Sequence, residues 1–146
     1  MAQLHSTSDH AQVLDTMIGL TRLSALQRAI IAGGSGMELY LGLRRRGFMR
    51  VATISTSWLP HKQHAIGLLA DRNSASIERA LTEISPFLCT NATVAVLIDS
   101  HDTGSGFDVR TKLQRMGFRI EAGVRCQQGF VLSAHRQGFG QMENAA

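Results

Sequence analysis

The sequence predicts a single α/β domain of three layers, in which helices cover both faces of a mostly parallel sheet that ends in an antiparallel hairpin. Short β-rich or apolar runs alternate with helical patterns over most of the chain, which is typical of parallel sheets. The run TVAVLID, at residues 93–99, is apolar and β-branched, as expected for a strand covered on both faces. Only the residues CQQ separate the last two runs, so these two strands are expected to form a hairpin.

The first helix and the first strand follow from the pattern of apolar residues. Val13, Met17 and Leu20 fall on one side of a helical turn, which predicts an amphipathic helix from residue 9 to about residue 23. The apolar run at residues 29–32 then predicts a strand that leads into a glycine-rich turn.

Beyond this turn, the sequence predicts a helix with a defined start and end. Ser35 and Glu38 match the capping box S-x-x-E, so the helix should begin at Gly36. It should end at Gly47, because glycine suits the left-handed position after a helix. The β-rich segment from Arg50 to Thr56 predicts the second strand.

The second half of the chain repeats the alternation of strand and helix. A buried strand is expected at residues 65–71, and Asn73 or Ser74 can cap the helix that follows. After the strand at residues 93–99, another helix should run from Ser105 to Gly117. The remaining segments, residues 118–125 and 129–136, are the two strands of the hairpin.

Length and composition support one domain. A chain of 146 residues buries about 68–70% of its unfolded surface, which is enough for a core without disulfides. We expect residues 9–136 to form the domain and residues 1–8 and 137–146 to be flexible ends. No apolar run reaches the roughly 18 residues that a membrane span needs.

The N-terminus and the cysteines favour a cytoplasmic location. The first residues lack a basic segment followed by an apolar one, so no signal peptide is expected. Cys89 and Cys126 are too few and too far apart for a disulfide framework or a Cys-rich metal site. His61 and His64 have H-x-x-H spacing, but a metal site would need a third ligand, so no metal is expected.

The charge of the chain is basic, with a formal net charge of +4 and 13 Arg against 2 Lys. A basic balance can indicate an anionic partner. However, the arginines are spread along the sequence, and the run Arg44, Arg45 and Arg46 sits where cations suit the end of a helix. With one Tyr and one Trp there is also no aromatic interleaving for base stacking, so we do not expect nucleic acid as a partner.

Candidate functional residues follow the ends of the predicted parallel strands, where open α/β sheets bind ligands. The first group is the glycine turn in AIIAGGSGMEL, with Gly33, Gly34 and Gly36. Free N–H groups at the helix start would favour an anion, although Glu38 partly neutralises that end. The turn can therefore bind a ligand or serve only as a tight connection between strand and helix.

Three further polar residues follow later strands. Asp71 can face the site or cap the next helix, and both readings fit the sequence. Asp99 and His101 follow the central strand, where a histidine beside a carboxylate can act as a general base. The same residues also fit a polar loop without chemistry.

The arrangement resembles the Rossmann-like domain of the class I S-adenosylmethionine-dependent methyltransferases. The similar segments are AIIAGGSGMEL, the stretch of residues 65–99 with its L-x-x-I-x-P-F-L approach to the central strand, and the closing hairpin FRIEAGVRCQQGFVLSAHR. The resemblance implies S-adenosylmethionine as cofactor, with Gly33, Gly34, Gly36 and Asp71 as its binding residues.

Several features depart from this family. Its turn usually reads acidic-x-Gly-x-Gly-x-Gly, but Ile30 takes the acidic place and Ala32 that of the first glycine. The acid that usually ends the second strand and binds the ribose is absent from residues 54–56. About ten residues then replace the helix, strand and helix that the family normally inserts before the next strand.

The sequence therefore favours a non-catalytic or ligand-sensing dimeric module with a degenerate S-adenosylmethionine site. The alternative is an active methyltransferase on a small molecule, with His101 as base and Asp99 beside it. Without an outer strand, the segment from Arg50 to Thr56 becomes a sheet edge, and edges must be covered or paired. We therefore predict a homodimer through this strand and Trp58.

Overall fold

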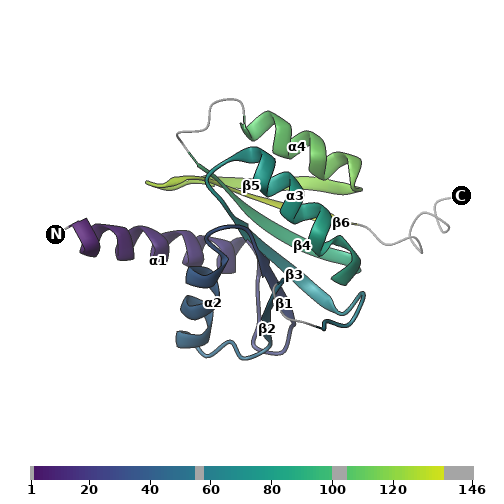
Figure 1. Ribbon diagram of the computed structural model, residues 1–146, viewed down its shortest axis with the longest axis horizontal. Coiled ribbons are helices and arrows are strands. Elements are labelled where there is room, and N and C mark those ends of the chain that lie inside the picture. Colours follow the sequence, from purple (N-terminus) through teal and green to yellow (C-terminus); the bar gives the residue numbers. More distant parts are fainter. Residues whose placement is uncertain (1, 55–57, 100–104, 137–146) are drawn as a thin grey trace, which may run out of the picture.

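The fold has three layers, with α1 and α2 on one face of a six-stranded sheet and α3 and α4 on the other (Figure 1). A computed structural model describes residues 2–54, 58–99 and 105–136, with the side chains of 11–54, 58–99 and 108–136. Within this part of the chain, no helix is both long and apolar enough to cross a membrane. The elements are α1 (Ala2–Thr21), β1 (Ala29–Ala32), α2 (Gly36–Arg45), β2 (Val51–Thr53), β3 (His64–Ala70), α3 (Ser74–Ile84), the short 3-10 helix η1 (Ser85–Phe87), β4 (Leu88–Asp99), α4 (Ser105–Arg115), β5 (Phe118–Arg125) and β6 (Gly129–Arg136).

The sheet confirms the predicted fold class. Its strand order is β2-β1-β3-β4-β6-β5, in which β2, β1, β3 and β4 are parallel and β6 is antiparallel to both β4 and β5. Ile31 pairs with Leu68, and Leu68 with Ala95, so β1, β3 and β4 end at one edge. We call this the carboxyl edge of the sheet, and the opposite one the amino edge.

Each face of the sheet has its own apolar core. On one face, Met17 of α1 and Leu43 of α2 are fully buried against β1, β3 and β4. On the other face, Leu81 of α3 and Leu113 of α4 are fully buried against β4 and β6. Burial of each such side chain contributes about 1.5–3 kcal/mol relative to exposure, so both helix pairs are held by packing.

The ends of the helices agree with the sequence at most positions. Asn73 caps α3 by accepting a 2.8 Å hydrogen bond from the N–H of Ser76. Gly47 and Gly117, which follow α2 and α4, have φ angles of +90° and +89°, as predicted for glycines after a helix. The hairpin strands have the bounds that the sequence predicts.

Three local expectations differ from the structure. The first helix begins at Ala2 rather than at residue 9, since no Gly or Pro interrupts the segment before it. The helix α2 begins at Gly36 as predicted, but the Ser35 side chain makes no cap hydrogen bond. The second strand covers only Val51–Thr53, and residues 55 and 56 of the predicted strand lie outside the described residues, as does the predicted tail at 137–146.

A short crossover joins β2 to β3 and leaves β2 at the edge of the sheet, as the sequence predicts. Ile54 and Leu59 of this connection pack against the core on the side of α3 and α4. Close to β3, the N–H groups of Lys62 and Gln63 donate to the carbonyls of Pro86 and Phe87. The described part of the crossover therefore covers part of the sheet face, and residues 58–63 contain no helix.

His64 is a buried histidine at the start of β3, only 3% exposed. Its Nδ1 lies 3.0 Å from the carbonyl oxygen of Phe87. Burial, and to a lesser extent the charge of Arg28, lower the pKa of His64, although the hydrogen bond with Phe87 acts in the opposite direction.

We expect His64 to make the protein less stable in mild acid. Below pH 6.5 the unfolded chain binds a proton at this side chain that the folded protein still excludes, so the free energy of unfolding falls as the pH drops. The slope is at most about 1.4 kcal/mol per pH unit. Urea unfolding at several pH values between 7.5 and 5 should show this slope in the wild type and a flatter one in His64→Gln; equal slopes would contradict the expectation.

Candidate functional site at the carboxyl edge of the sheet

The glycine turn after β1 is built by a close approach of two backbones. Gly33 has a φ of +100°, and a Cβ at this position would lie 2.2 Å from the carbonyl oxygen of Ala70 in β3. The N–H of Ser35 donates to the same oxygen, at 3.1 Å. A side chain at residue 33 would break this packing, so a glycine is needed here whether or not a ligand binds.

Asp71 closes the turn with its own carboxylate. Its Oδ2 accepts a 2.8 Å hydrogen bond from the N–H of Gly34, and its Oδ1 accepts a 2.7 Å bond from the N–H of Arg72. The N–H of Gly36 donates to the carbonyl of Gly33 at 3.1 Å. The N–H groups of residues 34, 35 and 36, which could have bound an anionic ligand, therefore all have acceptors within the protein.

The described residues line a small cavity beside the turn. A cavity of about 20 Å³ lies there, which is the size that one water molecule needs. Cofactor pockets are commonly about 300–1,000 Å³. The residues that line the cavity come from α1, the turn, α2, the ends of β3 and β4 and the hairpin turn: Val13, Ser35, Glu38, Leu39, Ala70, Leu97 and Gln128.

The two predicted catalytic residues are placed differently. Asp99 ends β4 at the carboxyl edge, half-buried and opposite Gly129 of β6 in the register. His101 lies outside the described residues, so its pairing with Asp99 stays a prediction. Among the residues that the structure describes, no group of three or more His, Cys, Asp or Glu could hold a metal ion, and His61 packs its ring edge-on against Phe87.

Comparison with solved structures shows what this arrangement resembles. A Burkholderia thailandensis 1,6-didemethyltoxoflavin-N1-methyltransferase, solved with S-adenosylhomocysteine, matches 92% of this chain over 80% of its own, with a TM-score of 0.61 at 10% identity. A SAM-dependent methyltransferase from Aquifex aeolicus matches 87% of this chain over 98% of its own, with a TM-score of 0.51 at 12% identity. A SAM-dependent O-methyltransferase from Thermotoga maritima matches 91% over 65%, with a TM-score of 0.52 at 17% identity.

The chain has the fold of the class I S-adenosylmethionine-dependent methyltransferases. No protein-family model and no curated protein match the sequence, so the likeness is one of fold.

Within the methyltransferase fold, the predicted cofactor residues form one group. Gly33, Gly34, Gly36 and Asp71 lie together at the carboxyl edge, and Asp71 contacts Gly34 directly. That these residues bind a cofactor stays a prediction.

The sequence reasoning missed Val13 and Gln128, which also line the small cavity. A signal for Gln128 was present, because the turn before an antiparallel last strand must lie at the carboxyl edge of its parallel neighbour. Val13 was recognised only as a residue of an amphipathic helix. Nothing in that pattern indicated that α1 would pack beside the turn of a methyltransferase fold.

Proposed function

We propose that this chain is a non-catalytic member of the methyltransferase fold, a dimeric module for ligand sensing or scaffolding rather than methyl transfer. The observation that carries the proposal is the 2.8 Å hydrogen bond from Gly34 to Asp71, because a protein carboxylate takes the place on the glycine turn that a bound anion would take.

The acidic residues at the glycine turn and the residues after β2 both bear on this proposal. Glu38 lies in the first turn of α2, and Asp71, which follows β3, contacts Gly34 just before this helix. Two carboxylates therefore lie near the start of α2. These two carboxylates would repel the carboxylate of S-adenosylmethionine but attract its ammonium and sulfonium groups, so the argument against cofactor binding is the contact of Asp71 with the turn rather than net charge. Residues 54–56, directly after β2, include no acid that could accept hydrogen bonds from the ribose hydroxyls, and this supports the proposal.

Thermal unfolding with S-adenosylhomocysteine tests the proposal. We expect the Tm at 1 mM ligand to equal the Tm without it. A ligand at 100 times its Kd would instead add about 2.7 kcal/mol to the free energy of unfolding and raise the Tm clearly. Such a rise would show that the ligand binds, and would overturn the proposal that the cofactor site is lost.

Variants of Asp71 separate a structural from a cofactor-binding carboxylate. Asp71→Ala leaves the N–H groups of Gly34 and Arg72 without their acceptor, and should cost about 1 kcal/mol of stability in urea unfolding. Asp71→Asn keeps one acceptor oxygen and should cost less. A variant that leaves stability unchanged but abolishes a ligand-induced rise in Tm would contradict the structural role.

The dimer proposal rests on the uncovered side of β2. This strand ends the sheet, Trp58 after it is 77% exposed, and Leu26 and Met49 beside it are 79% and 59% exposed. Large apolar side chains exposed next to a free strand edge favour pairing with a second copy.

Light scattering after size exclusion should give a mass of about twice the 15.9 kDa of one chain. Trp58→Ser should shift the protein toward the monomer, because it removes the largest exposed apolar side chain. Val124→Ser, which changes an exposed apolar residue on β5 at the opposite end of the sheet, is the matched control and should not. A wild-type monomer at micromolar concentration would exclude the dimer.

An active methyltransferase on a small molecule is the second candidate. The fold is that of a protein solved with S-adenosylhomocysteine, and Asp99 lies at the edge where the reaction would occur. In this case Asp99 would orient His101, which would accept the proton of the nucleophile while the methyl donor is held in line. The thermal unfolding experiment decides between the candidates, because this one requires the cofactor to bind.

A further inference from the structure

The fold gathers positive charges that are scattered in the sequence. Each of the parallel strands β1, β2 and β3 is preceded by a cation at or next to the amino edge: Arg28, Arg50 and Lys62. The helices α1 and α2 run back to the same edge, where α1 is followed by Arg22 and α2 ends in the arginine run at residues 44–46. All of these side chains are exposed.

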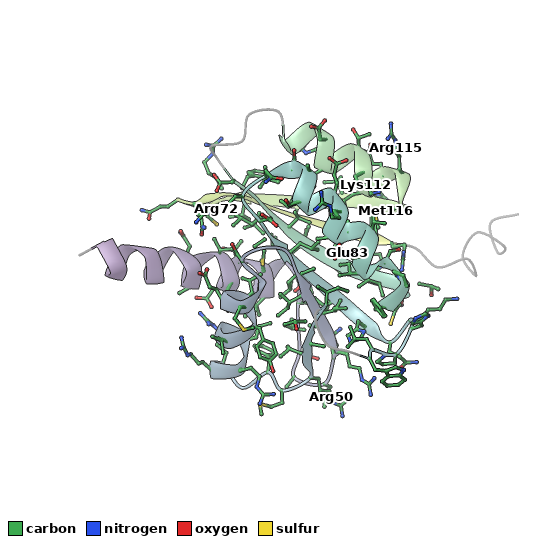
Figure 2. All side chains as sticks on the ribbon, viewed as in Figure 1. Arg50, Arg72, Glu83, Lys112, Arg115 and Met116 are labelled. Atoms are coloured by element: carbon green, nitrogen blue, oxygen red, sulfur yellow. The ribbon has the colours of Figure 1, made fainter. Side chains whose placement is uncertain are left out.

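The other half of the sheet continues the pattern. Helix α4 ends with Lys112 and Arg115, β5 begins next to Arg119, and β6 ends at Arg136. Figure 2 shows Arg115 at the right and Arg50 at the bottom of the view, while Arg72, which follows β3 at the carboxyl edge, lies at the left. Most of the 15 Lys and Arg residues of the chain therefore lie at one edge.

Four carboxylates lie at the carboxyl edge, while Asp15 pairs with Arg46 of the amino edge at 3.0 Å. Glu38, Asp71, Asp99 and Asp108 all lie at the carboxyl edge, where strands end and helices begin. On the amino edge, Glu83 in the last turn of α3 is an exposed acid among the cations. Helix dipoles account for the cations at the ends of α2 and α4. They do not account for Arg28, Arg50 or Arg119, which adjoin the starts of strands.

We infer that this cationic strip, the amino edge from Arg50 at β2 to Arg119 at β5, binds single-stranded nucleic acid. Six strands at about 4.8 Å spacing make the edge roughly 24 Å wide, which is long enough for several consecutive phosphates. Nearly all of its charges are guanidinium groups, which make paired hydrogen bonds to phosphate oxygens. This inference revises the expectation from the sequence, where the separation of the arginines argued against such a partner.

A cavity on the sheet face next to the strip contains groups that can hydrogen-bond to a nucleobase. It measures about 490 Å³ and is lined by Arg22, Glu121, Ser133 and His135, among others. Ser133 is only 2% exposed, and the Nδ1 of His135 lies 2.9 Å from the hydroxyl of Thr93. The exposed carboxylate of Glu121 and the half-buried imidazole of His135 can hydrogen-bond to the edge of a nucleobase, which a lipid tail does not offer.

Fluorescence anisotropy with a labelled 20-nucleotide single-stranded RNA of mixed sequence tests the inference on the full chain. We expect binding at 50 mM salt that weakens as salt is raised, with a slope of about −0.7 in log affinity against log salt for each phosphate contact. The absence of binding at 50 mM salt would overturn the inference.

Paired variants locate the surface. Arg45→Gln with Arg119→Gln removes two exposed charges from the strip, and should weaken binding about tenfold and flatten the salt slope. Arg79→Gln with Arg125→Gln removes two exposed charges elsewhere, from the middle of α3 and the far end of β5, and should change the affinity less than threefold. Equal weakening by both pairs would mean that only net charge matters, and would overturn the assignment to this edge.

Competition identifies the class of partner. Unlabelled RNA should displace the probe, while polyglutamate and vesicles containing phosphatidylserine at the same total charge should displace it at least tenfold less well. Equal displacement by either competitor would overturn nucleic acid in favour of an acidic protein or an anionic membrane. None of these results depends on S-adenosylhomocysteine, so the inference can fail while the proposed function stands.

Discussion

Gly33→Ala should destabilise the protein by about 4 kcal/mol, one of the largest effects that we expect from a single methyl group. Two costs add here. A φ of +100° costs a non-glycine residue about 1–2 kcal/mol, and overpacking a rigid site costs about 1–3 kcal/mol more. The obstacle is the carbonyl oxygen of Ala70, the last residue of a strand paired on both sides, and this backbone atom cannot move aside as a side chain would.

Gly47→Ala is the matched control for this substitution. Gly47 has nearly the same φ, +90°, but a Cβ there would meet nothing within 4 Å. Gly47→Ala should therefore cost only the free energy of holding a non-glycine residue in the left-handed conformation, about 1–2 kcal/mol. Urea unfolding of both variants and the wild type measures the difference directly. Equal losses would mean that the approach of β1 and β3 at the turn is looser than the structure indicates.

The order of helices and strands could be predicted because each element carries its own signal. The β-branched run before Asp99 and the glycines after α2 and α4 determine a strand and two helix ends through local physics alone. The start of α1 was missed because a polar segment without Gly or Pro is compatible with both a helix and a loose end. The capping box predicted at Ser35 is absent: its side chain makes no cap hydrogen bond, and the N–H that Glu38 would accept donates to the carbonyl of Ala70 in a different strand.

The candidate site could be predicted only as a set of residues at one edge. Parallel strands put Gly34 and Asp71 at the same edge, but only the structure shows that the carboxylate of one accepts the N–H of the other. The sequence left open whether the turn serves structure or a ligand, and this contact favours structure. The cationic strip could not be predicted from the sequence, because the residues that form it carry no local signal. Arg28, Arg50 and Arg119 are far apart in the sequence and meet only through the parallel order of the strands.

Gly129→Ala should cost about 3 kcal/mol, because the methyl group would meet the backbone of β4 at the carboxyl edge. A Cβ at Gly129 would lie 2.1 Å from the carbonyl oxygen of Ile98 and 3.1 Å from the Cα of Asp99. Relief requires β6 to move away from β4, which breaks the pairing of the antiparallel strand with its parallel neighbour. Because the new methyl group would also lie against Asp99, we expect the end of β4 at the carboxyl edge to move when β6 moves.

Gly123→Ala, in β5, tests whether the loss of stability depends on what the new methyl group meets rather than on how close it lies. A Cβ there would lie 2.2 Å from the ring of Phe130, almost the same distance, but this half-buried ring is a side chain and can rotate. We expect a loss of about 1 kcal/mol, which Phe130→Leu in the same chain should largely restore. Urea unfolding of Gly129→Ala, Gly123→Ala and the double variant measures all three. A larger loss at Gly123 than at Gly129 would mean that the ring of Phe130 is held more rigidly than the backbone of β4, which contradicts the packing of a strand buried between two helical layers.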